Sequence, residues 1–248
     1  MNAMDDRPRA AGEDPPETAS PDAPRVTHAM EDYLKAIYRL QGDGGQVTMQ
    51  RLTEELDLSG PSVTNMVKRL HELELVRHTR YRDVALTSAG EKVALRVIRH
   101  HRLLELYLTE SLGYDWDRVH AEAERLEHHV SAELEARIAS ALGHPTRDPH
   151  GDPIPSADGA IDAVSSQVLA DLEPGDVAAI TRVPDRDPEQ LRYLGELGVV
   201  PGQTVTVLEK LPFDGPIRVR VGQDEHLFGR PLAARINVAP RPRTKGSR

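Results

Sequence analysis

The chain has 248 residues, no cysteine and a formal net charge of −9 at pH 7. At about 100 to 200 residues per domain, this length predicts one large or two modest domains, and the missing cysteines exclude disulfides and thiolate metal sites. The negative charge argues against indiscriminate polyanion binding but permits a local basic patch. Residues 1–25 are proline-rich without an apolar block, so we expect a disordered tail rather than a signal peptide. No stretch approaches the roughly 20 apolar residues of a membrane span, so we expect a cytoplasmic protein without membrane contact.

Residues 26–90 predict a DNA-binding domain. Thr27 can cap a first helix, which the glycines of "GDGG" at 42–45 end. Thr48 opens a second, short helix, and Pro61 begins a third after the turn "LSGP". The following "LVRHTRYRDVALT" alternates as two short strands around an Arg-rich turn. Two short helices and such a hairpin are typical of a winged helix-turn-helix.

The helix that begins at Pro61 has a polar face suited to the major groove. Residues 61–82 carry five Lys or Arg against two Glu, so the local balance is basic. Asn65 could pair bidentately with adenine. The alternative is a solvated helix of mixed charge. The residues expected to contact DNA are Ser59, Pro61, Ser62, Thr64, Asn65, Lys68, Arg80 and Arg82.

Residues 91–142 predict a helical domain that carries candidate metal ligands, and the family resemblance given below implies that it also forms the dimer. "SAGE" at 88–91 is a capping-box pattern and should begin a long helix, and a second helix, itself uninterrupted, should begin after Gly113. The expected bounds are Ser88 to about Leu112, ended by Gly113, and Asp115 or Asp117 to Leu142, ended by Gly143.

The second of these helices carries a stripe of ligand types. At 100° per residue, four side chains fall within roughly 100° of one another, beside an apolar stripe. Unpaired carboxylates at such an edge would repel one another, and a divalent cation would supply the missing charge. The ligand stripe is His120, Glu124, Glu127 and His128, and the apolar stripe is Val119, Ala123, Leu126 and Val130.

A second ligand set is expected between the two helices. His101 stands where the preceding helix would favour an apolar residue, Glu105 follows one turn later, and His120 could join them. The alternative is that these groups pair with arginines on solvated helices. The candidate arginines are Arg102, Arg118 and Arg125, and His100 and His129 are expected on the surface.

The remaining chain predicts a linker and a small β-domain. Residues 143–160 are too rich in proline and glycine for regular structure and should form a linker. Residues 161–238, with short β-branched runs between Pro-Gly and Asp-Gly turns, should form a small β-barrel, followed by a basic tail at 239–248. The expected fold class is therefore mainly α with a small β-domain.

Four features in order resemble the diphtheria-toxin-repressor (DtxR) family of metal-dependent repressors. They are the winged helix-turn-helix, "ExxEHH", "DPHGDPIP" and "LEPGD…LGELGVVPGQTVTV", and they span residues 27–238. "MEDYLKAIY" and "LEHHV" look most like the manganese-responsive MntR branch, and the β-domain is FeoA-like. The resemblance implies a primary site at Asp32, Glu124, Glu127 and His128, and an ancillary site at His101, Glu105 and His120, joined by Asp187 and Gln190.

The resemblance also implies a metal and a partner. Iron-responsive relatives place Met and Cys where this chain has Asp32 and Glu124, and carboxylate oxygens suit Mn²⁺. Fe²⁺, Co²⁺, Zn²⁺ or Cd²⁺ could take its place. Manganese-responsive relatives without the β-domain carry Glu where this chain has Lys35, so their two-metal geometry does not transfer. We expect a homodimer that binds a palindromic operator on double-stranded DNA and represses metal-uptake genes.

Three alternatives stay open. The first is an iron-responsive regulator of the same family, and the second is a winged-helix regulator with an organic effector and structural histidines. The third is a metal-dependent hydrolase, which is disfavoured because the sequence contains no H-E-x-x-H and no nucleophile elbow. We therefore expect a protein that is not an enzyme.

Overall fold

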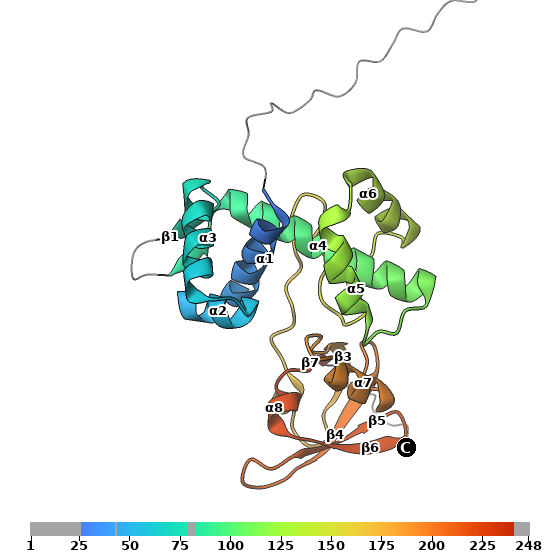
Figure 1. Cartoon of the computed structure of the whole chain (residues 1–248). Coiled ribbons are helices and arrows are strands. Elements are labelled where there is room, and N and C mark those ends of the chain that lie inside the picture. The colour runs from blue at the N-terminus through green and yellow to red at the C-terminus, as the bar shows by residue number, and fades with distance from the viewer. Residues whose placement is uncertain (1–25, 43, 79–82, 241–248) are drawn as a thin grey trace, which may run out of the picture.

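The computed structural model describes residues 26–42, 44–78 and 83–240 (Figure 1). The predicted N-terminal tail, the tip of the wing and most of the basic tail lie outside these residues. The described chain is mainly helical, with a small five-stranded sheet at its C-terminal end, as predicted from the sequence.

The N-terminal domain is a winged helix-turn-helix. Thr27 accepts a hydrogen bond from the Met30 amide at 3.4 Å, and Thr48 accepts one from Arg51 at 3.2 Å, so both predicted caps are confirmed. The two wing strands are antiparallel, with Val76 opposite Leu86. The elements are α1 (His28–Gly42), α2 (Met49–Leu56), α3 (Gly60–Glu72), β1 (Val76–His78) and β2 (Val84–Leu86).

The long helix α4 (Ser88–Leu112) joins this domain to the next (Figure 1). Its N-cap is Thr87, which accepts from the Gly90 amide at 3.2 Å, so the predicted cap at Ser88 was wrong by one residue. A Cβ on Gly90 would lie 2.0 Å from the Leu75 carbonyl oxygen, so only glycine permits this close approach. The first half of α4 packs into the N-terminal core through Ala94, and the second half packs into the next core.

The predicted continuous helix to Leu142 was wrong. Helix α5 (Val119–Leu126) tightens into a 3₁₀ turn, η1 (Glu127–His129), and Val130 is extended. Ser131 then caps α6 (Ala132–Ala141) by accepting from the Leu134 amide at 3.2 Å.

The break changes which side chains are buried. Leu126, predicted in the apolar stripe, is 37% exposed, whereas Glu127 is 0% exposed. The tighter turn therefore brings a carboxylate, rather than a leucine, into the interior.

Residues 143–160 contain no helix or strand, as expected, but they do not form an exposed spacer. Asp148, His150 and Asp152 are buried, together with Ile154. The Asp148 carboxylate accepts from the amides of His150 and Asp152, both at 2.9 Å, and so stabilises the turn. Residues 148–155 are therefore largely buried, and the carbonyls of Pro153 and Pro155 accept from Arg102 and Arg99 of α4.

The C-terminal domain is an antiparallel sheet with strand order β6-β5-β4-β3-β7. The hydrogen-bonded order does not close into a ring within the described chain. Pro240 pairs with Ala178, so the last strand extends past residue 238, where the domain was predicted to end. The elements are η2 (Leu169–Asp171), β3 (Val177–Arg182), α7 (Pro188–Glu196), β4 (Thr204–Lys210), β5 (Ile217–Val221), β6 (Asp224–Phe228), α8 (Arg230–Ala233) and β7 (Asn237–Pro240).

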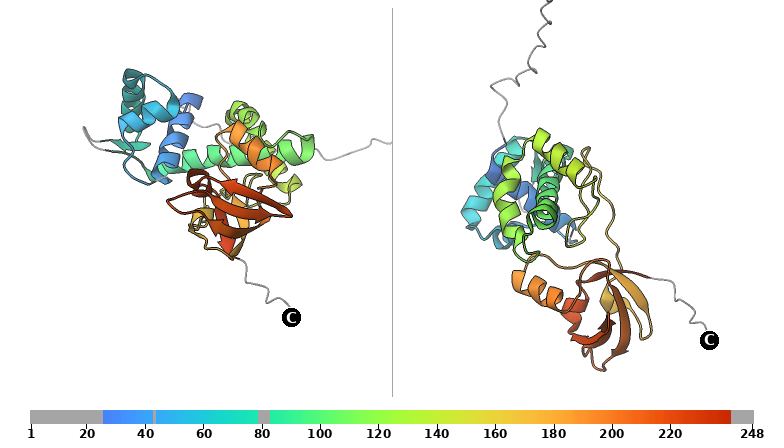
Figure 2. Two further views of the ribbon diagram at one scale, coloured as in Figure 1. Left: turned by 90° about the horizontal axis from the view of Figure 1, so that it is seen from below. Right: turned by 90° about the vertical axis from the view of Figure 1, so that its right-hand side faces the viewer.

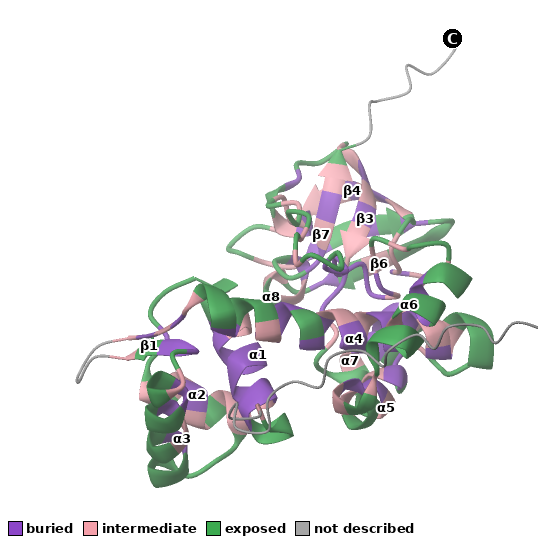
Figure 3. Cartoon of the chain, turned by 90° about the horizontal axis from the view of Figure 1, so that it is seen from above, coloured by how far each residue is buried: buried purple, intermediate pink, exposed green. Residues whose placement is uncertain are grey.

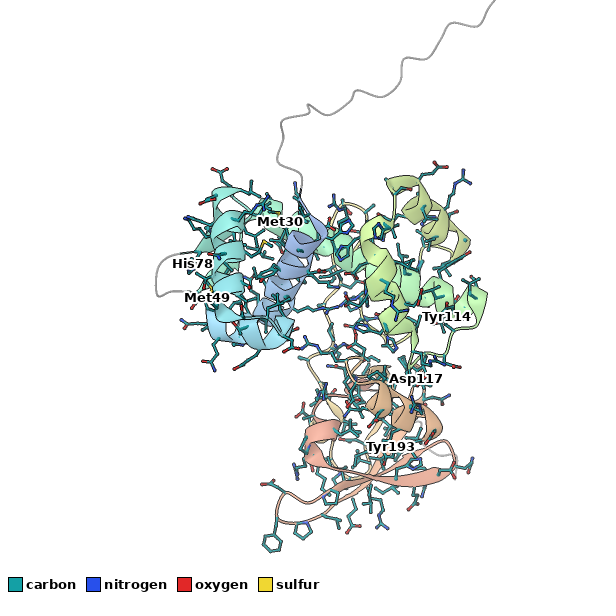
Figure 4. The ribbon with its side chains drawn as sticks, viewed as in Figure 1. Met30, Met49, His78, Tyr114, Asp117 and Tyr193 are labelled. Atoms are coloured by element: carbon teal, nitrogen blue, oxygen red, sulfur yellow. The ribbon has the colours of Figure 1, made fainter. Side chains whose placement is uncertain are left out.

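The sheet domain forms a separate lobe below the helices (Figure 2, right-hand view). The loop between α4 and α5 contacts the sheet domain, because Trp116 packs against the core of that domain. A Cβ on Gly195 of α7 would lie 2.8 Å from the Trp116 indole nitrogen, so the indole lies directly on the helix backbone. Asp117 in the same loop faces α7, which carries Tyr193, and it forms an ion pair with Arg192 at 3.0 Å (Figure 4).

Candidate metal centre

The first cluster joins α1 to the 3₁₀ turn after α5. His128 Nε2 lies 2.9 Å from Asp32 Oδ1 and 3.4 Å from Glu127 Oε1. His128 Nδ1 lies 2.7 Å from Glu31 Oε2, and Glu31 also accepts from Arg96 at 2.9 Å. One ligand atom from each of Asp32, Glu127 and His128 falls within 4.8 Å of the others, a spacing that could hold a metal ion.

A buried lysine enters the same cluster. Lys35 is 4% exposed, and its ammonium donates to both Glu124 carboxylate oxygens at 3.0 Å and to Glu127 Oε1. Burial raises the pKa values of Glu124 and Glu127, but the nearby positive charges of Lys35 and His101 outweigh it and lower both. Both glutamates are therefore carboxylates at neutral pH.

The second cluster lies where α4 meets α5. His101 Nε2 lies 3.0 Å from Glu105 Oε1 and from His120 Nδ1, and the last two atoms are also 3.0 Å apart. His101 Nδ1 lies 2.6 Å from Glu127 Oε2, so the imidazole of His101 bridges the two clusters.

Buried charges perturb the titration of the second cluster. Burial favours neutral His101, but Glu105 and Glu127 outweigh it and raise the pKa of His101 to about 9. Burial also favours neutral Glu105, yet the imidazoles of His101, His120 and His150 hold its pKa well below the ordinary value. The buried positive and negative charges of this cluster balance one another, so a divalent ion can bind there in exchange for the protons on the histidines.

A third group, which the sequence reasoning missed, comes from the segment predicted to be a linker. Glu105, Asp148 and His150 are all buried and offer ligand atoms within 4.8 Å of one another. His150 Nε2 lies 2.9 Å from the Trp116 carbonyl, which only accepts, so Nε2 carries the proton. His150 Nδ1 is left without a hydrogen-bond partner in the described chain, 3.8 Å from Glu105 Oε2.

The titration of this third group also reflects burial. Burial opposes the charge on His150, but Glu105 and Asp148 outweigh it and raise its pKa to about 9. Burial and the neighbouring carboxylates of Asp152 and Glu105 raise the pKa of Asp148 to about 8. Buried atoms without hydrogen-bond partners and displaced pKa values are features of functional sites, and they make this group a third candidate for metal binding.

The two ligands expected from the sheet domain differ in their surroundings. Asp187 caps α7, accepting from the Glu189 and Gln190 amides at 3.0 and 3.3 Å, and within the described chain it belongs to no group of His, Asp and Glu with metal-ligand spacing. The side-chain oxygen of Gln190 is buried without a hydrogen-bond partner among the described residues, so its role as a ligand stays a prediction. Asp185 instead lines the cavity of about 360 Å³ that also borders the second and third groups.

The arginine alternative receives little support from the contacts. Arg102 pairs with Asp152 at 3.2 Å, and Arg125 pairs with Glu122 at 3.0 Å, so neither neutralises the predicted ligands. His100, predicted on the surface, is 7% exposed and lies 2.9 Å from Glu135 Oε2. His129 is exposed, as predicted.

The donor chemistry fits a divalent cation. Within the described chain four groups have metal-ligand spacing, the fourth being His101, Glu124 and Glu127, and they offer only carboxylate oxygens and imidazole nitrogens, several of them fully buried. Carboxylate and imidazole ligands bind Mn²⁺, Fe²⁺, Co²⁺ and Zn²⁺, and buried carboxylates gain most from such an ion because water does not screen them.

The predicted recognition helix is exposed where it must meet DNA. Helix α3 presents an outer exposed face, whereas α1 behind it is largely buried (Figure 3). Ser59 and Ser62 hydroxyls lie 2.9 Å apart at its start. Six of the residues expected to contact DNA lie on or just before this helix, and all are exposed: Ser59, Pro61, Ser62, Thr64, Asn65 and Lys68. The other two, Arg80 and Arg82, lie outside the described residues.

Family models match three consecutive parts of the chain. Residues 25–84 match "Iron dependent repressor, N-terminal DNA binding domain", and residues 87–156 match "Iron dependent repressor, metal binding and dimerisation domain". Residues 167–240 match "FeoA domain". The part of the chain that the structure describes contains no helix long and apolar enough to cross a membrane.

The chain is also similar to relatives and solved structures over most of their length. The chain is 35% identical over 221 residues to the iron-dependent repressor IdeR of Mycobacterium tuberculosis (strain ATCC 25618 / H37Rv), covering 84% of this chain and 95% of that one. A solved manganese-dependent transcriptional repressor in complex with manganese is 39% identical, with a TM-score of 0.79 over 85% of this chain and 99% of that one. The structure of ScaR with bound Cd²⁺ is 31% identical, with a TM-score of 0.74 over 85% and 99%.

Proposed function

The chain belongs to the DtxR family of metal-dependent transcriptional repressors, and from that premise we propose that it represses metal-uptake genes when manganese is abundant. The matched domains bind DNA, bind metal and dimerise, and the family consists of repressors rather than enzymes.

The donor set of the first cluster is the observation that carries the choice of manganese. Asp32, Glu124, Glu127 and His128 supply hard oxygen and imidazole nitrogen, without sulfur. Similar proteins point both ways, because the relatives are named iron-dependent and the solved structures include manganese-dependent repressors. Since this ligand set also binds Fe²⁺, Co²⁺, Zn²⁺ and Cd²⁺, the metal available in the cell shares in the selection.

We propose a second ion position around Glu105. Its ligands would be Glu105, Asp148 and His150, with Asp185 on the wall of the adjoining cavity. His150 Nδ1 and Glu105 Oε2 face one another at 3.8 Å, and neither forms a hydrogen bond within the described chain, which supports this assignment. His101 and His120 would orient Glu105 through its other oxygen, to which each is held at 3.0 Å.

The proposed switch places the DNA-binding domain relative to the rest of the chain. Asp32 on α1 and His128 after α5 come from different domains and already lie 2.9 Å apart. A bound divalent cation would supply the charge that lets these ligands stay together. Glu31, by holding His128 Nδ1, leaves Nε2 turned toward Asp32 and Glu127. The domain arrangement that binds metal more tightly would then be the one that binds DNA.

Two copies of α3 would read a palindromic operator. In a two-fold dimer, each recognition helix enters one major groove, so the half-sites face one another at about one DNA turn or a multiple of it. The exposed polar face of α3 supports this geometry. Asn65→Ala should cost about 1–3 kcal/mol of discrimination at one adenine position, measured as competition between operator variants at fixed salt. An unchanged operator profile would remove Asn65 from the readers.

The test compares genomic DNA fragments retained by the purified protein with Mn²⁺, with anaerobic Fe²⁺ and with chelator at fixed salt. The proposal expects one palindrome, enriched with Mn²⁺ and lost with chelator. Stronger enrichment with Fe²⁺ at matched free-metal concentration would make the protein iron-responsive. If the protein retains the same DNA with metal and with chelator, the histidine–glutamate clusters are structural.

A further inference from the structure

Lys35 is the one primary amine that contacts the predicted ligands within the described chain. We propose that Lys35 is an intrinsic competitor for the first metal position: its ammonium occupies the carboxylate oxygens that a metal ion needs, and it must leave for the ion to bind. The metal concentration at which the repressor switches would thus depend on Lys35. The inference rests on the proposed metal site and adds a residue that opposes its filling.

The contacts place Lys35 within the ligand set. Its Nζ lies 3.0 Å from both oxygens of Glu124 and donates to Glu127 Oε1. Glu127 Oε1 is also the oxygen that faces His128 Nε2, at 3.4 Å. An ammonium offers three N–H donors, and here at least two carboxylates accept them. The ammonium therefore takes the lone pairs of the oxygens that face the proposed metal position.

Charge makes the two cations mutually exclusive. An ammonium and a divalent ion that shared Glu124 and Glu127 would repel one another at a few ångströms, in a region where Lys35 is 4% exposed and Glu127 is 0% exposed. A purely structural salt bridge would not need to engage the predicted ligands. Here the cation lies one helical turn from Asp32 on α1, on the side that carries the proposed site.

The structure provides a place for the displaced side chain. A cavity of about 380 Å³ between α1 and α2 is lined by Lys35 and by the carboxylate residues Asp32, Glu55 and Glu124. Glu55 on α2 pairs with Arg186 of the sheet domain at 3.1 Å. Because lysine is long and flexible, its ammonium could leave Glu124 and Glu127 and move toward Glu55, the wall carboxylate that is not a proposed ligand.

Lys35→Met tests the competition by removing the ammonium and keeping most of the aliphatic length. Mn²⁺ affinity is measured by isothermal titration calorimetry at fixed pH and salt. We expect the first ion to bind about tenfold or more tightly than in the wild type, because no cation has to be displaced. Lys35→Arg keeps the charge and should show no gain. Lys210→Met removes a lysine paired with Glu173 at 2.8 Å in the sheet domain and should leave the affinity unchanged.

A second measurement uses the unchanged protein, so it does not depend on whether Lys35→Met folds. Lysines are acetylated briefly with an amine-reactive ester and quantified by mass spectrometry, with chelator or with saturating Mn²⁺. The acetylation rate of Lys35 should be low in chelator and about tenfold higher or more with Mn²⁺. The acetylation rate of Lys210 should be the same in both conditions. Unaltered protection of Lys35 with Mn²⁺ bound would overturn the inference.

The two failures can be told apart. If Glu124→Gln binds Mn²⁺ with the same affinity as the wild type, or the wild type binds no Mn²⁺, the proposed metal site itself is wrong. The inference about Lys35 is then wrong as well. If the wild type binds Mn²⁺ at that site and Lys35→Met binds it equally or more weakly, only the competitor role is wrong, and Lys35 is then a structural counterion.

Discussion

The two acidic regions that flank α4 contain similar ligands but are neutralised differently. In the first, a single ammonium from Lys35 serves Glu124 and Glu127. In the second, Asp152 pairs with two guanidinium groups, at 3.2 Å from Arg102 and 2.9 Å from Arg182. A flexible ammonium can be exchanged for another cation, whereas a planar guanidinium held by several contacts is a permanent part of the structure.

This difference suggests separate roles. The first region joins residues of the DNA-binding domain to the 3₁₀ turn, and its counterion is movable. The second joins α4, the segment at 143–160 and the sheet domain, since Arg182 lies at the end of β3. We expect an ion in the first region to move the DNA-binding domain, and an ion in the second region to bind in a site that already joins the other domains.

The largest expected effect concerns Glu127, because it is buried and contacts Lys35, His101 and His128. Glu127→Ala leaves buried cations without their partner, so it should cost about 3–5 kcal/mol of unfolding free energy in chelator. Urea denaturation measures this loss. Glu124→Ala is the matched control, because the Glu124 side chain is 37% exposed and its loss should cost far less. Equal losses of unfolding free energy in the two variants would show that the deeper burial of Glu127 does not make it more important for stability than Glu124.

His150→Ala should weaken the second ion position about 10- to 100-fold, since a ligand nitrogen is removed. Equilibrium dialysis should then show one tightly bound Mn²⁺ fewer, while the first position keeps its affinity. His129→Ala, which changes an exposed histidine, provides the control. A loss of the first ion instead of the second would contradict the separation of the two regions.

A smaller effect is expected from pH. The pKa values of His101 and His150 are raised from 6.5 to about 9, so each contributes stability below pH 6.5 that disappears as pH rises through 9. In chelator, the unfolding free energy should fall over this range by up to about 1.4 kcal/mol per pH unit for each histidine.

Metal binding should show the opposite trend, because the ligands must lose protons before they coordinate. Mn²⁺ affinity should therefore rise between pH 6.5 and 9, and His150→Ala should make the slope of stability measured in chelator shallower. Unfolding free energies that stay constant over this range would mean that neither histidine holds an extra proton.

The sequence predicted most of the helical architecture because caps and apolar spacing are local signals. Thr27 and Thr48 do cap the first helices, and Gly113 does end α4 with a φ of 70°. The helix break after Leu126 was missed because "EHHVSAE" contains neither proline nor glycine. Ser131 offered the signal that could have marked it, since serine is a frequent N-cap.

The ligand set was predicted only where helical spacing supplied it. Periodicity placed Glu124, Glu127 and His128 on one side, but Asp32 entered through the family resemblance alone. Asp148 and His150 lie in a segment without periodicity, so no face could be assigned to them. The crowding of His and Asp in "DPHGD" was the remaining signal. The contacts of Lys35 depend on how α1 meets α5, which spacing within one helix cannot predict.

The length and continuity of α4 have a mechanical consequence. This helix has 25 residues, with Ala94 in the DNA-binding core, Glu105 among the proposed ligands and His101 holding Glu105 in place. One residue inserted between Ala94 and His101 would turn one end by about 100° and move it by about 1.5 Å relative to the other. The recognition helices of a dimer would then be out of phase with the grooves of their operator, although every ligand and every base-reading side chain was still present.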